Sequence, residues 1–105
     1  FKLKTKANVG VTTVGIYTAP AATTTVVIGI TLANTSGSGV NVGVGITRAG
    51  TTEDVKLLKN APIPQGSSLE FMAGNKVVLQ TTDTLTVDSD TNNSVDASLT
   101  IMEIT

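Results

Sequence analysis

The segment DSDTNN at residues 88–93 holds the side chains best suited to binding a metal ion. Oxygen ligands at every second position are how calcium loops begin. An EF-hand also needs a glutamate at position twelve, but that position, counted from Asp88, is Leu99. The EF-hand interpretation therefore fails. An irregular calcium site remains one interpretation, and its ligands would be Asp88, Asp90, Asn92 and Asp96. The other, which we favour, is a hairpin turn, because Asp and Asn side chains bond to nearby backbone and tolerate positive φ.

Catalytic chemistry is poorly represented elsewhere. The 105 residues include no histidine, cysteine or tryptophan. Without histidine the chain lacks Ser-His-Asp and Cys-His machinery, the usual zinc sites and the commonest general acid–base. Glu53 and Asp54 are sequence neighbours, so in a strand they would point to opposite faces rather than share a pocket. We therefore expect a protein that is not an enzyme and needs no cofactor.

Two glycines lie inside the run GVNVGVGIT at residues 39–47. The run matches neither a phosphate-binding P-loop nor a dinucleotide-binding fingerprint. Gly43 and Gly45 alternate with Val42, Val44 and Ile46, which predicts a strand. Small residues in a strand indicate a bulge or the close approach of another backbone. A local bulge is the first interpretation, and contact with a neighbouring subunit is the second, so both glycines are interface candidates.

The elements that would position these residues are strands. Threonine and valine dominate, and they fit a pleated, half-buried surface. Alternating patterns predict strands at 1–6, 13–18, 26–35, 40–47, 53–59, 68–73, 76–80, 84–88 and 94–105. Three of these runs place apolar residues on one face: Val26, Ile28, Ile30 and Leu32; Val40, Val42, Val44 and Ile46; Val95, Ala97, Leu99 and Ile101.

The breaks between the strands carry turn chemistry. NTSGSG at 34–39 predicts a hairpin loop, and RAGTTED predicts a second loop. The segment 60–68 predicts a crossover, because Pro62 and Pro64 lack the N–H that a central strand needs. Strands at this spacing indicate one all-β domain, a small β-sandwich or jelly-roll-like fold of eight or nine antiparallel strands. We expect residues 1–12 to form an N-terminal arm or edge strand and residues 13–105 to form the sandwich.

Charge is low but unevenly distributed. Seven basic and eight acidic residues give a net charge of −1, which does not favour nucleic-acid binding, and no apolar run is long enough for a membrane span. Lys2, Lys4 and Lys6 open the chain, whereas no basic residue follows Lys76. This polarity fits docking on an acidic neighbour, or simply solvated strand faces. The chain begins at Phe1 without a methionine, so we expect that something was removed before it.

Four stretches, in chain order, carry a family resemblance: IYTAPAATTTVVIGITLANTS, ITRAGTTEDVKLLKNAPIPQGSSLEF, GNKVVLQTTDTLTV and SVDASLTIMEIT. They resemble small virion structural proteins of tailed bacteriophages, especially those of aquatic and cyanobacterial phages. The resemblance implies a β-sandwich particle component without catalysis, found in the virion.

Within that family, a head decoration (cement) protein on the outer capsid surface is the expectation. It would bind the major capsid protein, and it would assemble as a homotrimer. The N-terminal residues would then form an added strand at the capsid interface: Phe1, Lys2, Leu3, Lys4 and Lys6. The alternatives are a tail, fibre or neck component, or a carbohydrate- or cell-surface-binding module. Only three aromatic residues are present, which counts against the stacking that sugar and nucleic-acid binders use.

Overall fold

The computed structural model describes residues 1–49, 53–71 and 77–104, and for Phe71 the backbone alone. Within this part the chain forms nine strands and no helix, so no helix there could cross a membrane. Parts of the predicted strands 68–73 and 76–80 lie outside the described residues. The strands are β1 (Lys2–Val9), β2 (Val14–Thr18), β3 (Thr24–Asn34), β4 (Val40–Thr47), β5 (Asp54–Ile63), β6 (Ser68–Phe71), β7 (Val77–Leu79), β8 (Thr84–Ser89) and β9 (Val95–Ile104).

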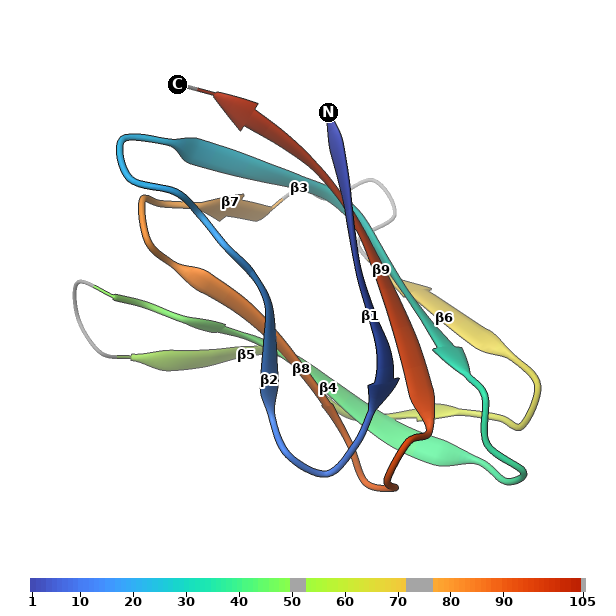
Figure 1. Cartoon of the computed structure of the whole chain (residues 1–105). Coiled ribbons are helices and arrows are strands. Elements are labelled where there is room, and N and C mark those ends of the chain that lie inside the picture. Colours follow the sequence, from blue (N-terminus) through green and yellow to red (C-terminus); the bar gives the residue numbers. More distant parts are fainter. Residues whose placement is uncertain (50–52, 72–76, 105) are drawn as a thin grey trace.

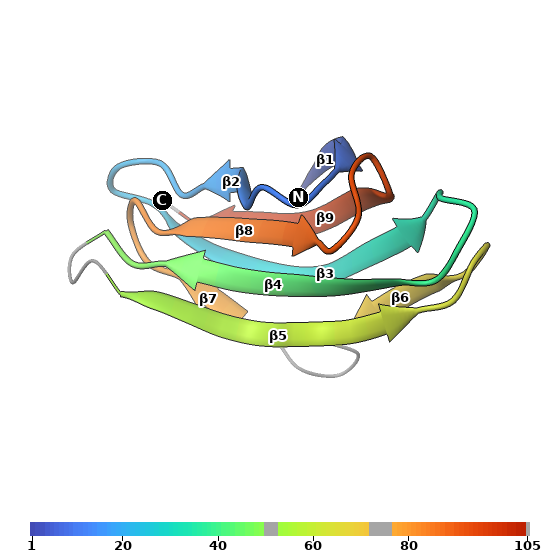
Figure 2. The ribbon, with the colours of Figure 1, turned by 90° about the horizontal axis from the view of Figure 1, so that it is seen from below.

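The strands form two sheets that pack face to face, as Figures 1 and 2 show. Sheet A has the order β1-β9-β3-β6. β7 also pairs with β3, nearer to the start of that strand than β6 does. Sheet B has the order β2-β8-β4-β5. All pairings are antiparallel. Because β6 and β7 lie in succession along β3, they share the place of a single edge strand.

This strand order is that of a jelly roll, with β6 and β7 together as one of the eight strands. The predicted all-β sandwich is therefore confirmed. The chain crosses between the sheets at almost every connection, and among the described strands only β4 and β5 are consecutive and paired with each other.

The prediction of a hairpin at 34–39 is wrong, and so is the prediction of a hairpin tip at 88–93. The first segment joins β3 of sheet A to β4 of sheet B, and the second joins β8 of sheet B to β9 of sheet A. Turn-forming residues determine where the chain bends. Whether the two strands beside the bend pair with each other depends on whether they enter the same sheet, and here they do not. Asn93 does adopt a positive φ of 51°, as turn chemistry predicts.

The crossover after β5 is shorter than predicted. β5 continues to Ile63 and includes Pro62, which pairs with Asn41 of β4. β5 is the last strand of sheet B, and an edge strand tolerates proline because its outer N–H has no partner to lose.

The core lies between the sheets. The predicted inward faces of β4 and β9 are confirmed, with their apolar residues at most 8% exposed. The prediction for β3 is half wrong, because Ile30 and Leu32 are buried but Val26 and Ile28 are not. A bulge between Val27 and Gly29 in the pairing with β9 shifts the alternation by one residue, so Val27 faces inward instead.

Candidate functional site

The N-terminal strand β1 forms one edge of sheet A. It pairs with β9 from Lys2 to Val9, and no strand of the described chain pairs with its other side. Every β1 residue except Val9 is exposed. Near its end the strand bulges, Asn8 takes a positive φ of 58°, and the Asn8 N–H donates to Asp96 Oδ1 at 3.0 Å. β1 therefore carries a free row of backbone N–H and C=O groups beside the compact core.

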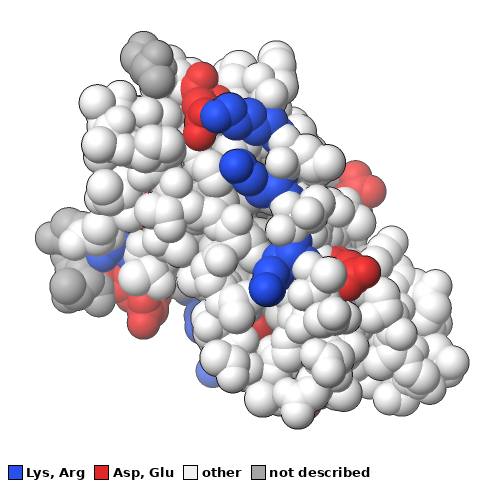
Figure 3. Space-filling model, viewed as in Figure 1, with Lys and Arg blue, Asp and Glu red and all other residues white. Residues whose placement is uncertain are grey.

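The three lysines of β1 point toward the seam between the sheets. Lys2, Lys4 and Lys6 pair with β9 residues that face the core, and opposite residues of an antiparallel pair share a face. Sheet B ends at β2, so the lysines are not covered and stay in solvent. Figure 3 shows this row of positive charge along β1, beside the seam that Figure 1 shows between β1 and β2. Inward-pointing lysines on an edge strand oppose indiscriminate strand pairing.

One of these lysines belongs to a polar cluster that joins the two sheets. Lys2 Nζ lies 2.7 Å from Glu103 Oε1. The Tyr17 hydroxyl donates to Glu103 Oε2 at 2.5 Å, so at its 2.8 Å contact with Thr25 Oγ1 it accepts. Because Tyr17 lies in β2 and the other three residues lie in sheet A, the cluster ties the edge of sheet B to sheet A.

The cluster shifts the pKa of both of its acids. The Lys2 ammonium first, and the Tyr17 hydroxyl second, lower the pKa of Glu103 below its ordinary value of 4.5. Burial first, and the hydrogen bond to Glu103 second, raise the pKa of Tyr17 above its ordinary value of 10.0. Both shifts favour the charged carboxylate and the neutral phenol, which are the forms that the hydrogen bonds need.

Sequence reasoning missed Glu103 and Tyr17. The signal for Glu103 was present, because the alternation that buries Leu99 and Ile101 places Glu103 next on the same inward face. A carboxylate at the inward end of an amphipathic strand needs a partner, and Lys2 is close enough only because β1 pairs with β9 in this register.

Gly43 and Gly45 lie beneath their own chain. β5 bulges over β4 at these positions, as the local-bulge interpretation expects. A Cβ on Gly45 would lie 2.9 Å from the Val55 carbonyl oxygen, and one on Gly43 would lie 2.5 Å from Asp88 Oδ1. These close contacts come from this chain's own atoms, and the role of both glycines at an interface stays a prediction.

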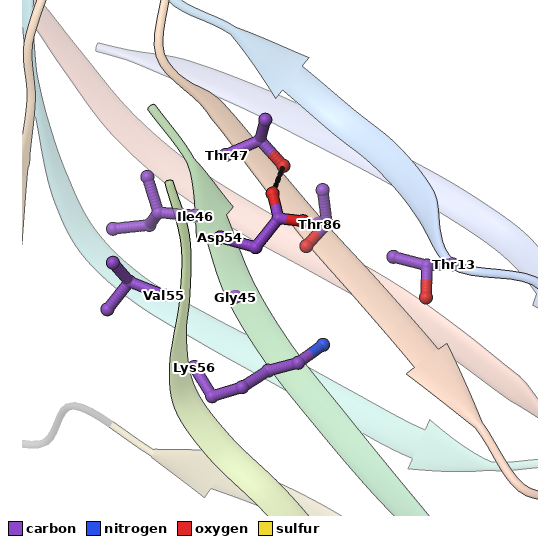
Figure 4. A pocket seen from close by; sticks show the side chains of 8 residues that line it. All are labelled: Thr13, Gly45, Ile46, Thr47, Asp54, Val55, Lys56 and Thr86. Carbon is purple, nitrogen blue, oxygen red and sulfur yellow. Dashed lines mark hydrogen bonds between the residues drawn. The ribbon is translucent and has the colours of Figure 1, made fainter. Parts of the chain in front are cut away.

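A shallow hollow of about 170 Å³ lies over Gly45 on the outer face of sheet B, as Figure 4 shows. Thr47 Oγ1 donates to Asp54 Oδ1 there at 2.9 Å. The Lys56 side chain extends from β5 across β4, as Figure 4 shows, and its Nζ lies 3.8 Å from Asp88 Oδ2 of β8. The ionic groups of this hollow are therefore engaged with protein partners, and the arrangement brings no free nucleophile or base together.

The residues proposed as calcium ligands have separate protein partners. Asp88 Oδ2 accepts from Thr13, Asp90 Oδ1 accepts from the Asn41 N–H, and Asp96 Oδ1 accepts from the Asn8 N–H. Asn92 lies against Gly10. Across the described ranges, no three acidic side chains form a group that could hold a metal ion. The calcium site stays a prediction.

The chain matches no protein-family model and no curated protein. Among solved structures it is similar to a pentameric capsid protein isolated from metagenomic phage sequences, with a TM-score of 0.39 and 20% sequence identity. The match covers 89% of this chain and 57% of that protein, so this chain spans little more than half its length. A likeness at this level transfers neither the role nor the assembly of that protein.

Proposed function

We propose that this chain is a non-enzymatic virion structural protein that decorates the outer capsid surface. It would bind the major capsid protein, bridge neighbouring capsid subunits and act without a cofactor. Two observations support the proposal. The sequence resembles small virion structural proteins of tailed phages. The jelly roll is also an architecture that capsid and lectin domains use, which is an argument by analogy between folds.

The observation that carries the proposal is the state of β1. An edge strand with a free backbone row can accept a strand of another protein, and main-chain hydrogen bonds then supply affinity while side chains supply specificity. Lys4 and Lys6 have no ion-pair partner in the described chain, so they are free to meet acidic residues of the capsid protein. Phe1 and Leu3 are 87% and 67% exposed, and Leu3 lies on the face of the strand opposite to the lysines.

Deletion of residues 1–8 tests the role of this segment. All the described side chains of β1 before Val9 are exposed, so the core should survive the deletion. We expect folded protein, checked by circular dichroism, that no longer incorporates into particles. Normal incorporation would refute the docking role of residues 1–8.

A charge-reversal pair keeps the test valid if the deletion unfolds the chain. Lys4→Glu with Lys6→Glu should weaken binding to the particle roughly thirtyfold, since each of two contacts becomes less favourable by about 1 kcal/mol. The matched control is Lys56→Glu with Lys59→Glu, which reverses two charges on β5, the edge strand of the other sheet. The control should bind normally, and equal losses in both pairs would contradict the proposal.

Location in the particle separates the head from the tail. A head decoration protein should be present in copy numbers comparable with the capsid protein, whereas a tail, fibre or neck component should be present in few copies. Images of purified particles with the protein labelled would decide between them.

A further inference from the structure

The outer faces of the two sheets differ in a way that the decoration role does not explain. A sandwich that stands alone in water usually carries polar residues on both outer faces. Sheet B does so, with Thr47, Lys56, Thr86 and Asp88 facing outward around its hollow. Sheet A carries polar outward residues at one end, but at its other end the outward positions form a cluster, here called the apolar face: Leu3, Val26, Val78, Met102 and Ile104.

Strand register assembles the apolar face from four strands. Val26 of β3 pairs with Met102 of β9 on one side and with Val78 of β7 on the other, so the three form one row across the sheet. Ile104 continues the face along β9, and Leu3 adds to it from β1. Leu3, Val78 and Ile104 are 67%, 48% and 51% exposed. Exposed aliphatic residues that adjoin in this way mark an interaction surface, unlike isolated ones.

The apolar face carries no charge. Among the described outward residues of sheet A only Glu70 and Asp96 are charged, and they pair with Thr31 and Ala33 at the other end of β3. The polar residues that adjoin the face are hydroxyl side chains, including Thr24 and Thr100. A hydroxyl both donates and accepts, so such a surface can hydrogen-bond to a copy of itself.

These properties select a second copy of this chain as the occupant. Packing of apolar face against apolar face brings no like charges together, and depletion of charge is typical of the core of an interface. The free edge of β1 is unsuited to pairing with itself, because antiparallel β1 strands would set lysine beside lysine on one face. An acidic partner fits the β1 edge, whereas the uncharged apolar face of a second copy fits the apolar face.

We propose that copies of this chain associate through the apolar face of sheet A, which leaves the lysine row of β1 free. Two copies would pack as a pair of facing sheets, and three would bring their apolar faces together around a threefold axis, as in the trimer expected from the family resemblance. The inference does not rest on the decoration role, because a tail component or a free oligomer would use the same face.

Sedimentation velocity of the full chain tests the inference. The wild-type protein should sediment at a multiple of its 10.7 kDa mass. Val78→Glu should weaken association roughly hundredfold, because it buries a charge without a partner, and should give the 10.7 kDa species. Val55→Glu is the matched control: Val55 is 42% exposed on an edge strand of the other sheet, so this variant should stay associated.

Thr100→Glu provides a second disruption if Val78→Glu unfolds, because Thr100 is exposed on the same outer face. Circular dichroism would confirm that each variant is folded. A wild-type chain that is monomeric at about 100 µM, far above a micromolar dissociation constant, would overturn the inference. So would a folded Val78→Glu or Thr100→Glu chain that associates like wild type. Neither result would touch the capsid-binding proposal, which the β1 variants test.

Discussion

Two polar clusters join the sheets at opposite ends of β3, and they are built from different chemistry. At one end Asn34 is buried and neutral. Its Nδ2 donates to the carbonyl oxygens of Ser38, Ile63 and Pro64, and its Oδ1 accepts from the N–H and hydroxyl of Ser36. At the other end Glu103 is charged, and its partner Lys2 is largely in solvent.

The difference shows that the Asn34 cluster determines the path of the chain, whereas the Glu103 cluster holds an exposed surface strand in place. Asn34 satisfies backbone groups of two crossovers at once, 34–39 and the turn after β5, so it fixes where the chain passes between the sheets. The Glu103 cluster instead holds the first residues of an exposed edge strand, where solvent, pH and a partner can all act on it. Mutations in the two clusters should therefore differ in size and in kind.

Asn34→Ala should have the largest effect. The substitution leaves buried carbonyl and N–H groups without partners, which should lower the free energy of unfolding by on the order of 3 kcal/mol. Urea denaturation measures this change. Ser36→Ala is the control, because it removes only the hydroxyl of one partner and should cost about 1 kcal/mol or less. Equal losses for the two variants would show that Asn34 does not organise the crossovers.

Tyr17→Phe should have an intermediate effect. It keeps the ring in the core and removes the hydroxyl that connects Thr25 and Glu103, so we expect a loss of about 1 kcal/mol in the same assay. Thr18→Val is a suitable comparison, because Thr18 lies in β2 like Tyr17 and loses only an exposed hydroxyl hydrogen bond to Thr84 of β8, which should change stability little. A loss as large as that of Asn34→Ala would remove the distinction between the two ends.

The two clusters also mark how far sequence reasoning reached. Alternation of valine and threonine was enough to place the strands and the inward faces of β4 and β9. It did not reveal the bulge in β3, because Val26 to Leu32 alternate in sequence whether or not a residue is left unpaired. Asn34 fell where the predicted strand 26–35 overlaps the predicted loop 34–39, and its role was not foreseen because its partners Ile63 and Pro64 are distant in sequence.

The candidate site was predicted in composition but not in orientation. Alternation separated the lysines of β1 from Phe1 and Leu3. Only the register with β9 shows that the lysines face the seam, and that Leu3 joins an outward face with Val26 and Met102. Long-range pairing determines which side of an edge strand faces the core, and local patterns do not contain it.

Lys2→Met should have the smallest effect at neutral pH and a distinct effect in acid. Exposed ion pairs contribute little, so we expect stability at pH 7 to be nearly unchanged. Glu103 has a pKa below 4.5 in the folded state, so the stability it contributes is complete above pH 4.5 and is lost as the pH falls through the folded value. Without Lys2 that folded pKa should rise toward 4.5, and the acid-dependent part of the stability should shrink.

Lys6→Met is the control for this last comparison. Lys6 lies on the same face of β1, four residues after Lys2, and forms no ion pair within the described ranges. Urea denaturation of the wild type and both variants between pH 7 and about pH 3 would measure the difference, and Glu103→Gln would show how much of the acid dependence belongs to this carboxyl. The acid dependence should decrease in Lys2→Met and Glu103→Gln and stay unchanged in Lys6→Met. If Lys6→Met decreased it equally, the cause would be the general positive charge of β1 and not the contact at 2.7 Å. The charged end of β3 would then be a solvated strand face, without a specific link between β1 and the core.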